Sequence, residues 1–347
     1  MNSDLLLSAC DCAIITSPAS LRYLSGYDMS DAVILLTKDH KWYLTNPLYE
    51  VAVKSALNDG FQTVILGREE GVAFIREKVA SAERIGVEYD HLTLSRLHAL
   101  IGEGKQTSDL SPLLAKMRLV KTQDEIAVIK EAERIVDLAY ADVLPLIKVG
   151  LTEKAIAEEI RSALLRHGAE GVAFDTIVAF GENAAMPHAV PSDRKLKRGD
   201  CVLMDFGAKY KGYCSDFTRT IHCGAPSEKF RAAYQCVRAA QQAAISYLEM
   251  GGRNAREADR AARNVVDSSE FRGTFRHTLG HGVGIEIHEL PYLSERSEDV
   301  LSDQTVFTLE PGIYLEGEFG IRIESLVALE NGKLTVIDRS DKEIFII

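Results

Sequence analysis

The sequence predicts two domains, an α/β domain followed by a larger α+β domain. The chain has 347 residues, which is more than a single hydrophobic core usually organises. Strand and helix patterns alternate up to the turn-forming stretch 108–112, whereas after residue 172 the two kinds of pattern are grouped separately. We therefore expect an α/β domain over residues 1–115 and an α+β domain over residues 116–347.

The first domain is expected to have a mostly buried sheet with helices against it. Short apolar runs typical of buried strands alternate with helical patterns, and no glycine-rich phosphate-binding motif accompanies them. The predicted elements are strands over 11–15, 32–37 and 42–45, a helix over 51–57, a strand over 61–66, a helix over 72–79 and a strand over 84–88.

Four helices are predicted in the second domain. Thr122-Gln123-Asp124-Glu125 has the pattern of a capping box, and apolar residues follow it at helical spacing until Pro145 and Gly150. A second helix is expected from Thr152 to Gly168, where the glycine ends it. The other two are expected over 228–250 and 255–267.

Charge and composition exclude several classes of protein. The formal net charge of -11 lacks the basic surface of a nucleic-acid binder and argues against binding to anionic membranes. Apolar runs are too short to span a bilayer, and the N-terminus lacks the basic region of a signal peptide, so we expect a cytoplasmic protein. Cys10 and Cys12 form a close pair, but no second pair completes a zinc-type spacing, and we expect structural cysteines.

Two acids stand in a predicted hairpin over 201–221. Asp205 lies in an otherwise buried run, where a charge is costly unless it is paired or bound to metal. With a loop at Tyr210-Lys211, Asp205 faces Asp216 directly; with a loop at Lys211-Gly212, the two are diagonal neighbours. Both registers place the carboxylates on one face, where they need a cation or a shared proton. The alternative is a turn acid bonded to backbone.

Three of the nine histidines fall within twelve residues, at His277, His281 and His288. Glycines alternate with other residues between them, which lets the backbone bend. On a straight strand His281 and His288 would face opposite sides, but a bend can bring both to one cleft. Neutral imidazole is a common ligand of divalent metals, and the alternative is ordinary surface or core histidines.

Two further acids interrupt apolar strands near the C-terminus. Glu310 ends one strand directly before a Pro-Gly turn, and Glu324 lies in another, with Arg322 on the same face two residues earlier. An Arg–Glu pair on a solvent-exposed face is the alternative, but the neighbouring residues are too apolar for an exposed strand. A buried arginine can instead orient a metal-binding carboxylate.

Together these segments supply four carboxylates and at least one imidazole. This oxygen-rich set suits two divalent ions such as Mn²⁺ or Co²⁺, with Zn²⁺ as an alternative, whereas no EF-hand-like loop favours Ca²⁺. Two ions about 3.5–4 Å apart can bridge a water and bring its pKa toward neutrality. Such a site needs no serine nucleophile, and the chain has no Gly-x-Ser-x-Gly motif.

At these residues the chain resembles the pita-bread metallopeptidases, which include methionine aminopeptidase, aminopeptidase P, prolidase and the non-metal creatinase. The resemblance covers nearly the whole chain, including the segment 118–126 that resembles the entry into the family's catalytic domain. It implies a creatinase-like N-terminal domain and a pita-bread catalytic domain. It also implies a five-ligand metal site, which falls on Asp205, Asp216, His281, Glu310 and Glu324.

His277 and the Arg-x-Glu sequence at Arg322 resemble the Xaa-Pro branch of this family. The resemblance implies hydrolysis of the first peptide bond of short Xaa-Pro peptides or dipeptides, with Glu310 also handling the proton. His188, His277 and His288 would bind the substrate and the tetrahedral intermediate, and Arg322 would hold Glu324. A homodimer is implied as well. The segment Asn46-Pro47-Leu48 departs from the pattern of related N-terminal domains, which puts any substrate contact there in doubt.

Two alternatives to this interpretation are a methionine-type or broader aminopeptidase of the same fold, and a catalytically dead peptide-binding module. The first would cleave bonds other than Xaa-Pro, and the second would bind no stoichiometric metal.

Overall fold

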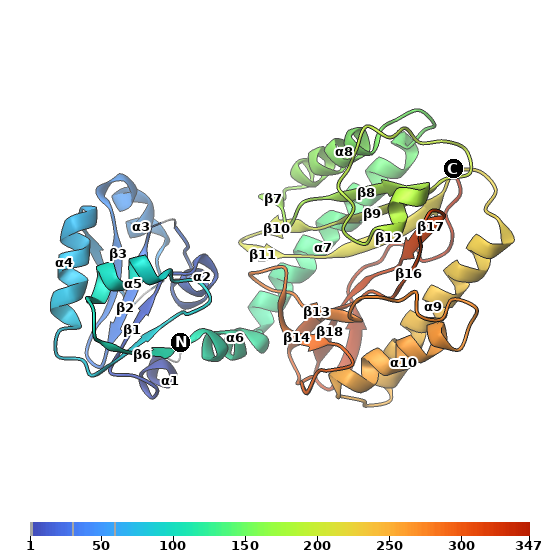
Figure 1. Cartoon of the computed structure of the whole chain (residues 1–347). Coiled ribbons are helices and arrows are strands. Elements are labelled where there is room, and N and C mark those ends of the chain that lie inside the picture. Colours follow the sequence, from blue (N-terminus) through green and yellow to red (C-terminus); the bar gives the residue numbers. More distant parts are fainter. Residues whose placement is uncertain (1–2, 30, 59) are drawn as a thin grey trace. The chain divides into compact units, whose positions relative to one another are not determined.

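The computed structural model describes residues 3–29, 31–58 and 60–347, and it has the predicted fold class (Figure 1). It forms two compact units, residues 1–118 and 119–347. Helix α6 (Ser111–Leu119) runs through the stretch where the sequence placed the domain boundary. Residues 1 and 2, which belong to the stretch considered as a signal peptide, lie outside the described residues.

The first unit is built on a six-stranded sheet with strand order β4-β3-β2-β1-β5-β6. The pairs β1–β2 and β2–β3 are antiparallel, and the other three pairs, β3–β4, β1–β5 and β5–β6, are parallel. The five predicted strands are present, each within one residue of its expected ends. The strands are β1 (Cys12–Ile15), β2 (Val33–Thr37), β3 (Lys41–Thr45), β4 (Gln62–Ile65), β5 (Arg84–Val87) and β6 (Gln106–Asp109).

Helices cover both faces of this sheet. Leu6, Leu21 and Val53 from α1, α2 and α3 pack on one face, while Ile75 and Leu100 from α4 and α5 pack on the other. The sequence missed α1, α2, α5 and the polar strand β6. The helices are α1 (Ser3–Leu7), α2 (Pro18–Ser25), η1 (Pro47–Tyr49), α3 (Glu50–Ala56), α4 (Arg68–Lys78) and α5 (Leu94–Ile101).

The second unit contains a three-stranded sheet with order β12-β9-β8 and a five-stranded sheet with order β14-β13-β15-β18-β19. A second three-stranded sheet has the order β11-β10-β7, and β16 and β17 form a two-stranded sheet. The strands of the first half are β7 (Gly171–Val172), β8 (Ile177–Phe180), β9 (Cys201–Phe206), β10 (Ala208–Tyr210), β11 (Tyr213–Cys214) and β12 (Phe217–His222). Those of the second half are β13 (Gly280–Gly282), β14 (Glu289–Leu293), β15 (Thr305–Leu309), β16 (Gly312–Leu315), β17 (Phe319–Arg322), β18 (Ser325–Glu330) and β19 (Lys333–Val336).

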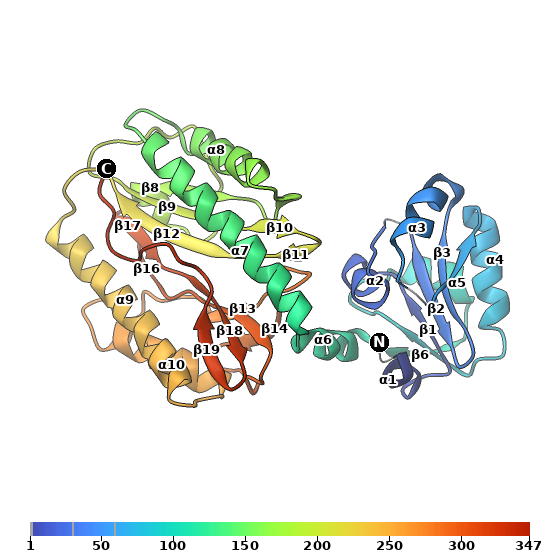
Figure 2. The same cartoon turned by 180° about the vertical axis from the view of Figure 1, so that it is seen from behind.

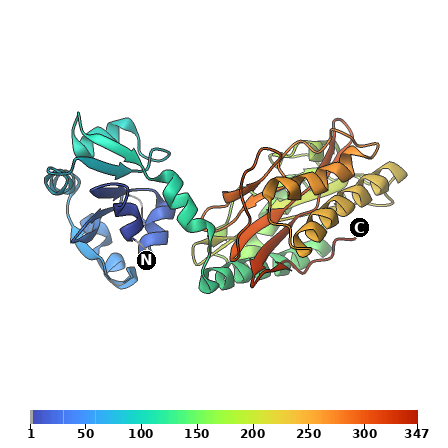
Figure 3. The same ribbon diagram turned by 90° about the horizontal axis from the view of Figure 1, so that it is seen from below.

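Four long helices cover these sheets, as the sequence predicted. α7 and α8 pack on β8, β9 and β12, and Figure 2 shows α7 lying across these strands. α9 and α10 run side by side and pack against β15 and β18 (Figure 3). The helices are α7 (Gln123–Val143), η2 (Leu144–Leu146), α8 (Glu153–Arg166), η3 (Gly181–Ala185), α9 (Glu228–Glu249) and α10 (Ala255–Asp267).

The capping box at the start of α7 is confirmed. Glu125 N donates to Thr122 Oγ1 at 3.2 Å, and Thr122 N donates to Glu125 Oε2 at 2.7 Å. Because the backbone N–H groups of Thr122 and Glu125 both have partners, the first turn of α7 is fixed at the start of the second unit. Among the described residues, every helix is too short or too polar to cross a membrane.

All six cysteines lie within the described residues, and none forms a disulfide. Cys10 and Cys12 pack on opposite faces of the first sheet, so they do not share a site. Burial raises the pKa of Cys12, Cys201 and Cys214 to about 12. Cys236 on α9 is the sixth cysteine and is only partly buried.

Candidate metal centre

The five predicted ligands lie in or next to different strands of the second unit. Asp205 lies near the end of β9, and Asp216 precedes β12. Tyr210 pairs with Tyr213 around the loop Lys211-Gly212, which is the second of the two predicted registers. Asp205 therefore pairs with Thr218, and Asp216 lies diagonally across the hairpin.

The other three ligands come from the second half of the unit. His281 is the central residue of β13, Glu310 directly follows β15, and Glu324 lies between β17 and β18. Gln241 on α9 fixes the backbone before both acids, since its Nε2 donates to Leu309 O at 2.9 Å and to Ile323 O at 3.0 Å.

The five side chains converge on one buried cluster. Carboxylate oxygens of Asp205, Asp216 and Glu324 lie within 4.8 Å of one another. His281 Nε2 lies 3.5 Å from Asp216 Oδ2 and 3.4 Å from Glu310 Oε1. Four carboxylates and one imidazole in such proximity can hold divalent cations.

Two buried carboxylate oxygens of this cluster have no hydrogen-bond partner among the described residues. They are Asp205 Oδ1 and Glu324 Oε1. The second oxygen of each carboxylate is engaged, because Asp205 Oδ2 pairs with Arg322 and Glu324 Oε2 accepts from Thr218 Oγ1 at 2.7 Å. A bound cation would satisfy both orphan oxygens, so the residues present fit a divalent metal.

The pKa values of the site without metal also favour a bound cation. Burial, followed by repulsion from neighbouring carboxylates, raises the pKa of Asp216 and Glu324 well above their ordinary values. Burial also raises the pKa of Glu310 to about 8, against the opposing charge of Arg322. Burial and the nearby His288 lower the pKa of His281 to about 4, which keeps its imidazole neutral and able to ligate.

Arg322 differs from the sequence prediction. Its guanidinium pairs with Asp205 and reaches Glu324 only through Thr218, whose Oγ1 accepts from Arg322 Nε at 3.2 Å. The sequence predicted that Arg322 orients a metal-binding carboxylate and holds Glu324. The carboxylate that it contacts is Asp205, because β17 ends at Arg322 and the two-residue alternation of a strand does not continue to Glu324.

His277 supports this arginine through a tyrosine. Arg322 Nη1 donates to the Tyr314 hydroxyl at 2.7 Å, and His277 Nε2 lies 2.8 Å from the same hydroxyl. His277 Nδ1 lies 2.8 Å from Thr278 O, which can only accept, so Nε2 accepts from Tyr314. Burial, then Arg322, lowers the pKa of His277 to about 3. His277 was predicted to bind substrate, but both of its ring nitrogens have partners within the protein.

His281 and His288 meet in one cleft, as the glycine pattern predicted. Their ring centroids are 4.3 Å apart, and the register of β13 shifts between His281 and Gly282. A Cβ at Gly280 would lie 2.0 Å from Thr308 O, and one at Gly282 would lie 2.1 Å from Leu290 O. Glycine is therefore required at both positions for the bend to pack.

A cavity of about 1070 Å³ opens onto the cluster. His188, His277 and His288 lie in its wall; His188 and His288 are exposed, whereas His277 is partly buried. Apolar side chains complete the wall, which combines polar groups at the metal end with apolar surface beyond it. They include Phe174, Ile177, Pro187, Val190, Pro191 and Ile287.

Sequence reasoning missed three residues of the site: Tyr314, Thr218 and Arg219. Thr218 follows Asp216 by two residues on β12, so strand alternation offered a signal for it. Tyr314 contacts Arg322 across the hairpin of β16 and β17, so strand pairing offered a signal for it as well. Arg219 acts through Asp338, which lies 119 positions away, and no local pattern marks it.

A buried cluster of four carboxylates and one imidazole at the end of a cavity is typical of an enzyme that uses divalent metal ions. Residues 127–331 match the model of metallopeptidase family M24, and residues 7–120 match the creatinase/prolidase N-terminal domain. The chain belongs to metallopeptidase family M24, and it is a metallo-exopeptidase with the pita-bread fold.

Related sequences and solved structures match this chain along nearly its full length. The uncharacterised peptidase YqhT of Bacillus subtilis is 35% identical over 97% of this chain and 96% of its own. An Xaa-Pro dipeptidase from Bacillus anthracis matches with a TM-score of 0.91 and 35% identity, covering 99% of this chain and 98% of that one. An X-Pro aminopeptidase from Thermotoga maritima matches with a TM-score of 0.92 and 33% identity, covering 100% of both chains. The predicted resemblance to the Xaa-Pro branch is confirmed.

Proposed function

We propose that this enzyme hydrolyses the N-terminal Xaa-Pro bond of short peptides or dipeptides with two divalent metal ions. The observation that carries the proposal is the convergence of four carboxylates and a neutral imidazole beside a cavity with an apolar wall. Asp205, Asp216, His281, Glu310 and Glu324 are the proposed ligands. The oxygen-rich set favours Mn²⁺, with Co²⁺ or Zn²⁺ as alternatives.

The bound metals would supply a hydroxide near neutral pH and charge stabilisation for the tetrahedral intermediate. Glu310 is the proposed proton carrier, because it lies beside His281 and burial raises its pKa to about 8 in the metal-free site, close to the pH at which proton transfer is required. His188 and His288 line the cavity and would bind the substrate carbonyl or the peptide terminus.

Arg322 and His277 act in the proposal as a supporting pair rather than as direct substrate ligands. Arg322 holds Asp205 in place, and His277 holds Arg322 through Tyr314. A buried group that fixes a ligand carboxylate contributes to both metal affinity and turnover.

Recognition of proline would depend on the shape of its ring. A bond before proline has no N–H, so the site cannot select it through an acceptor at that position. Phe174, Ile177 and Ile287 offer the apolar wall that a pyrrolidine ring would contact.

The test compares Xaa-Pro, Xaa-Pro-Yaa and the matching Xaa-Ala peptides on the Mn²⁺-loaded protein, with metal content measured per chain. We expect two metals per chain and far higher kcat/KM for the proline substrates. Equal rates on alanine and proline substrates would favour a broader or methionine-type aminopeptidase. Absence of stoichiometric metal would favour a catalytically inactive binding module.

A cytoplasmic location and a homodimer are part of the same proposal. Six cysteines without a disulfide fit a reducing compartment. In the first unit, Leu48 and Val51 are exposed by 88% and 84%, which offers apolar area for a partner copy. Light scattering of the purified protein would report the dimer directly.

A further inference from the structure

Arg219 is a fully buried charge in the catalytic unit that the proposed mechanism does not use. It follows Thr218 on β12, and its side chain is 1% exposed. The guanidinium stacks over the Phe217 ring, with its carbon 4.3 Å from the ring centroid. A buried charge is costly unless it is paired and hydrogen-bonded, so its partners indicate what it stabilises.

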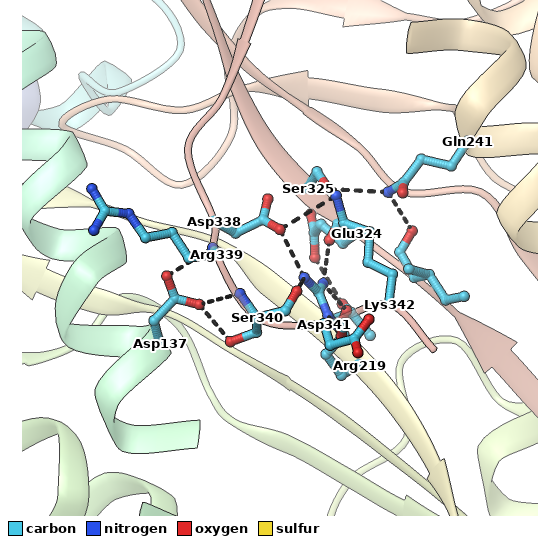
Figure 4. A network of polar contacts seen from close by, with 12 residues as sticks. Asp137, Arg219, Gln241, Glu324, Ser325, Asp338, Arg339, Ser340, Asp341 and Lys342 are labelled. Carbon is cyan, nitrogen blue, oxygen red and sulfur yellow. Dashed lines mark hydrogen bonds and ion pairs between the residues drawn. The ribbon is translucent and has the colours of Figure 1, made fainter. Parts of the chain in front are cut away.

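The guanidinium joins two segments that are distant in sequence (Figure 4). Nη2 pairs with Asp338 Oδ2 at 2.7 Å and donates to Ser340 O at 2.9 Å, and Nε donates to Asp341 O at 3.1 Å. Nη1 donates to Glu324 O at 2.5 Å. One side chain therefore holds the C-terminal segment 338–341 against the backbone of a proposed metal ligand.

Glu324 is fixed at three points by this part of β12. Its N donates to Thr218 O at 3.1 Å, its carbonyl oxygen accepts from Arg219, and its Oε2 accepts from Thr218 Oγ1. The remaining oxygen, Oε1, is the one without a hydrogen-bond partner among the described residues. The hydrogen bonds thus restrain the backbone and one carboxylate oxygen and leave the other oxygen for a cation.

We propose that Arg219 and Asp338 form a positioning pair for Glu324, so that the C-terminal segment 338–341 is part of the support of the metal centre. The inference rests on the proposed role of Glu324 as a ligand. Arg219 does not line the cavity and touches none of the side chains proposed to bind substrate. Its effect on catalysis therefore passes through Glu324.

The geometry requires arginine rather than a point charge. The planar guanidinium presents donors in fixed directions and reaches Asp338, Glu324 and Asp341 at once, whereas the ammonium of lysine is compact and lacks this fork. Arg219→Lys keeps a positive charge near Asp338 but loses part of the hold on Glu324.

The test separates positioning from folding with a double variant. Arg219→Met/Asp338→Leu removes both buried charges together, a change that proteins often tolerate without loss of stability. The control is Arg194→Met/Asp200→Leu, a partly buried ion pair of 2.8 Å in the same unit whose residues do not contact Glu324. Mn²⁺ affinity is measured by competition with a chelator, the ligand geometry by the absorption spectrum of the Co²⁺-loaded protein, and folding by circular dichroism.

We expect the Arg219→Met/Asp338→Leu protein to fold and to bind Mn²⁺ about 10–100-fold more weakly, with an altered Co²⁺ spectrum. Its kcat should fall with little change in KM. The control should keep its Mn²⁺ affinity and its kcat within twofold of wild type, with an unchanged Co²⁺ spectrum. Should the double variant fail to fold, Arg219→Lys replaces it with the same expected direction.

A folded variant that binds Mn²⁺ within twofold of wild type and keeps its Co²⁺ spectrum would overturn the proposal. Wild-type protein that binds no metal would overturn both this proposal and the proposed function. Wild-type protein that binds metal but does not prefer Xaa-Pro bonds would overturn only the specificity, because the positioning is measured through the metal.

Discussion

Removal of the metal should make the catalytic unit sensitive to pH between 6 and 8. In the metal-free site, burial and mutual repulsion raise the pKa of Asp216, Glu310 and Glu324 above their ordinary values. The folded state then binds more protons than the unfolded state over the window from the ordinary pKa up to the raised one. Stability therefore falls as pH rises through that window.

The size of the stability loss between pH 6 and 8 can be worked out for Glu310, because its pKa of about 8 lies at the upper end of this pH range. With an ordinary value of 4.5, raising the pH from 6 to 8 removes about 2 kcal/mol of stability through this one carboxyl. For a unit spanning residues 119–347 this corresponds to a fall of roughly 4–8 °C in its melting temperature. Asp216 and Glu324 act in the same direction.

Bound metal should reverse both effects. A cation replaces the protons that the site would otherwise take up, so the melting temperature should become nearly flat between pH 6 and 8. Each site filled at a hundredfold excess over its Kd adds about 2.7 kcal/mol. The assay is calorimetry of the whole protein at pH 6, 7 and 8, with a chelator or with Mn²⁺.

The two units should unfold in separate transitions, and the transition that responds to metal is assigned to the catalytic unit. The other transition serves as an internal control. A metal-free protein whose transitions are unchanged from pH 6 to pH 8, or unaffected by Mn²⁺, would refute the reasoning.

Three further predictions follow from single side chains. His281→Ala should lose metal, whereas His288→Ala should keep its metal and lose about 10²–10³-fold in kcat. Metal analysis and kinetics of both variants would check this, and loss of metal in the His288 variant would contradict these roles. Tyr314→Phe removes the hydroxyl that accepts from Arg322 Nη1, and Mn²⁺ titration should show about tenfold weaker binding. Burial raises the pKa of Glu133 well above its ordinary value of 4.5, so Glu133→Gln should lose stability less steeply as the pH rises above 4.5, by up to about 1.4 kcal/mol per pH unit. Identical slopes in denaturant titrations would disprove this.

Features of the fold that depend on neighbouring residues could be predicted from the sequence. Buried apolar runs located the strands, and Thr122 with Glu125 located the start of α7. The loop geometry limited Asp205 and Asp216 to two registers, and one of them is observed. Alternating side chains and caps are local properties, so one chain suffices to read them.

Features that depend on distant partners could not be predicted from the sequence. β6 is polar and lies in the sheet because it pairs with β5. α2 is a different case, because its cap at Ser17 and Pro18 is a local signal that was present in the sequence. Arg219 finds Asp338 across 119 positions, and no local pattern marks that pair. Arg322 was assigned to Glu324 by strand alternation, but the strand ends first.

The burial of the cysteines has a practical consequence for chemical labelling. Thiol reagents attack the thiolate, and burial keeps Cys10, Cys12, Cys201, Cys214 and Cys223 in the thiol form. The partly buried Cys236 is then the position where a maleimide or a fluorine tag should attach first. It lies on α9, the helix whose Gln241 holds the backbone before Glu310 and Glu324. A dye or ¹⁹F probe attached to Cys236 of the wild-type protein would therefore lie on α9, and its signal should change when metal binds to Glu310 and Glu324.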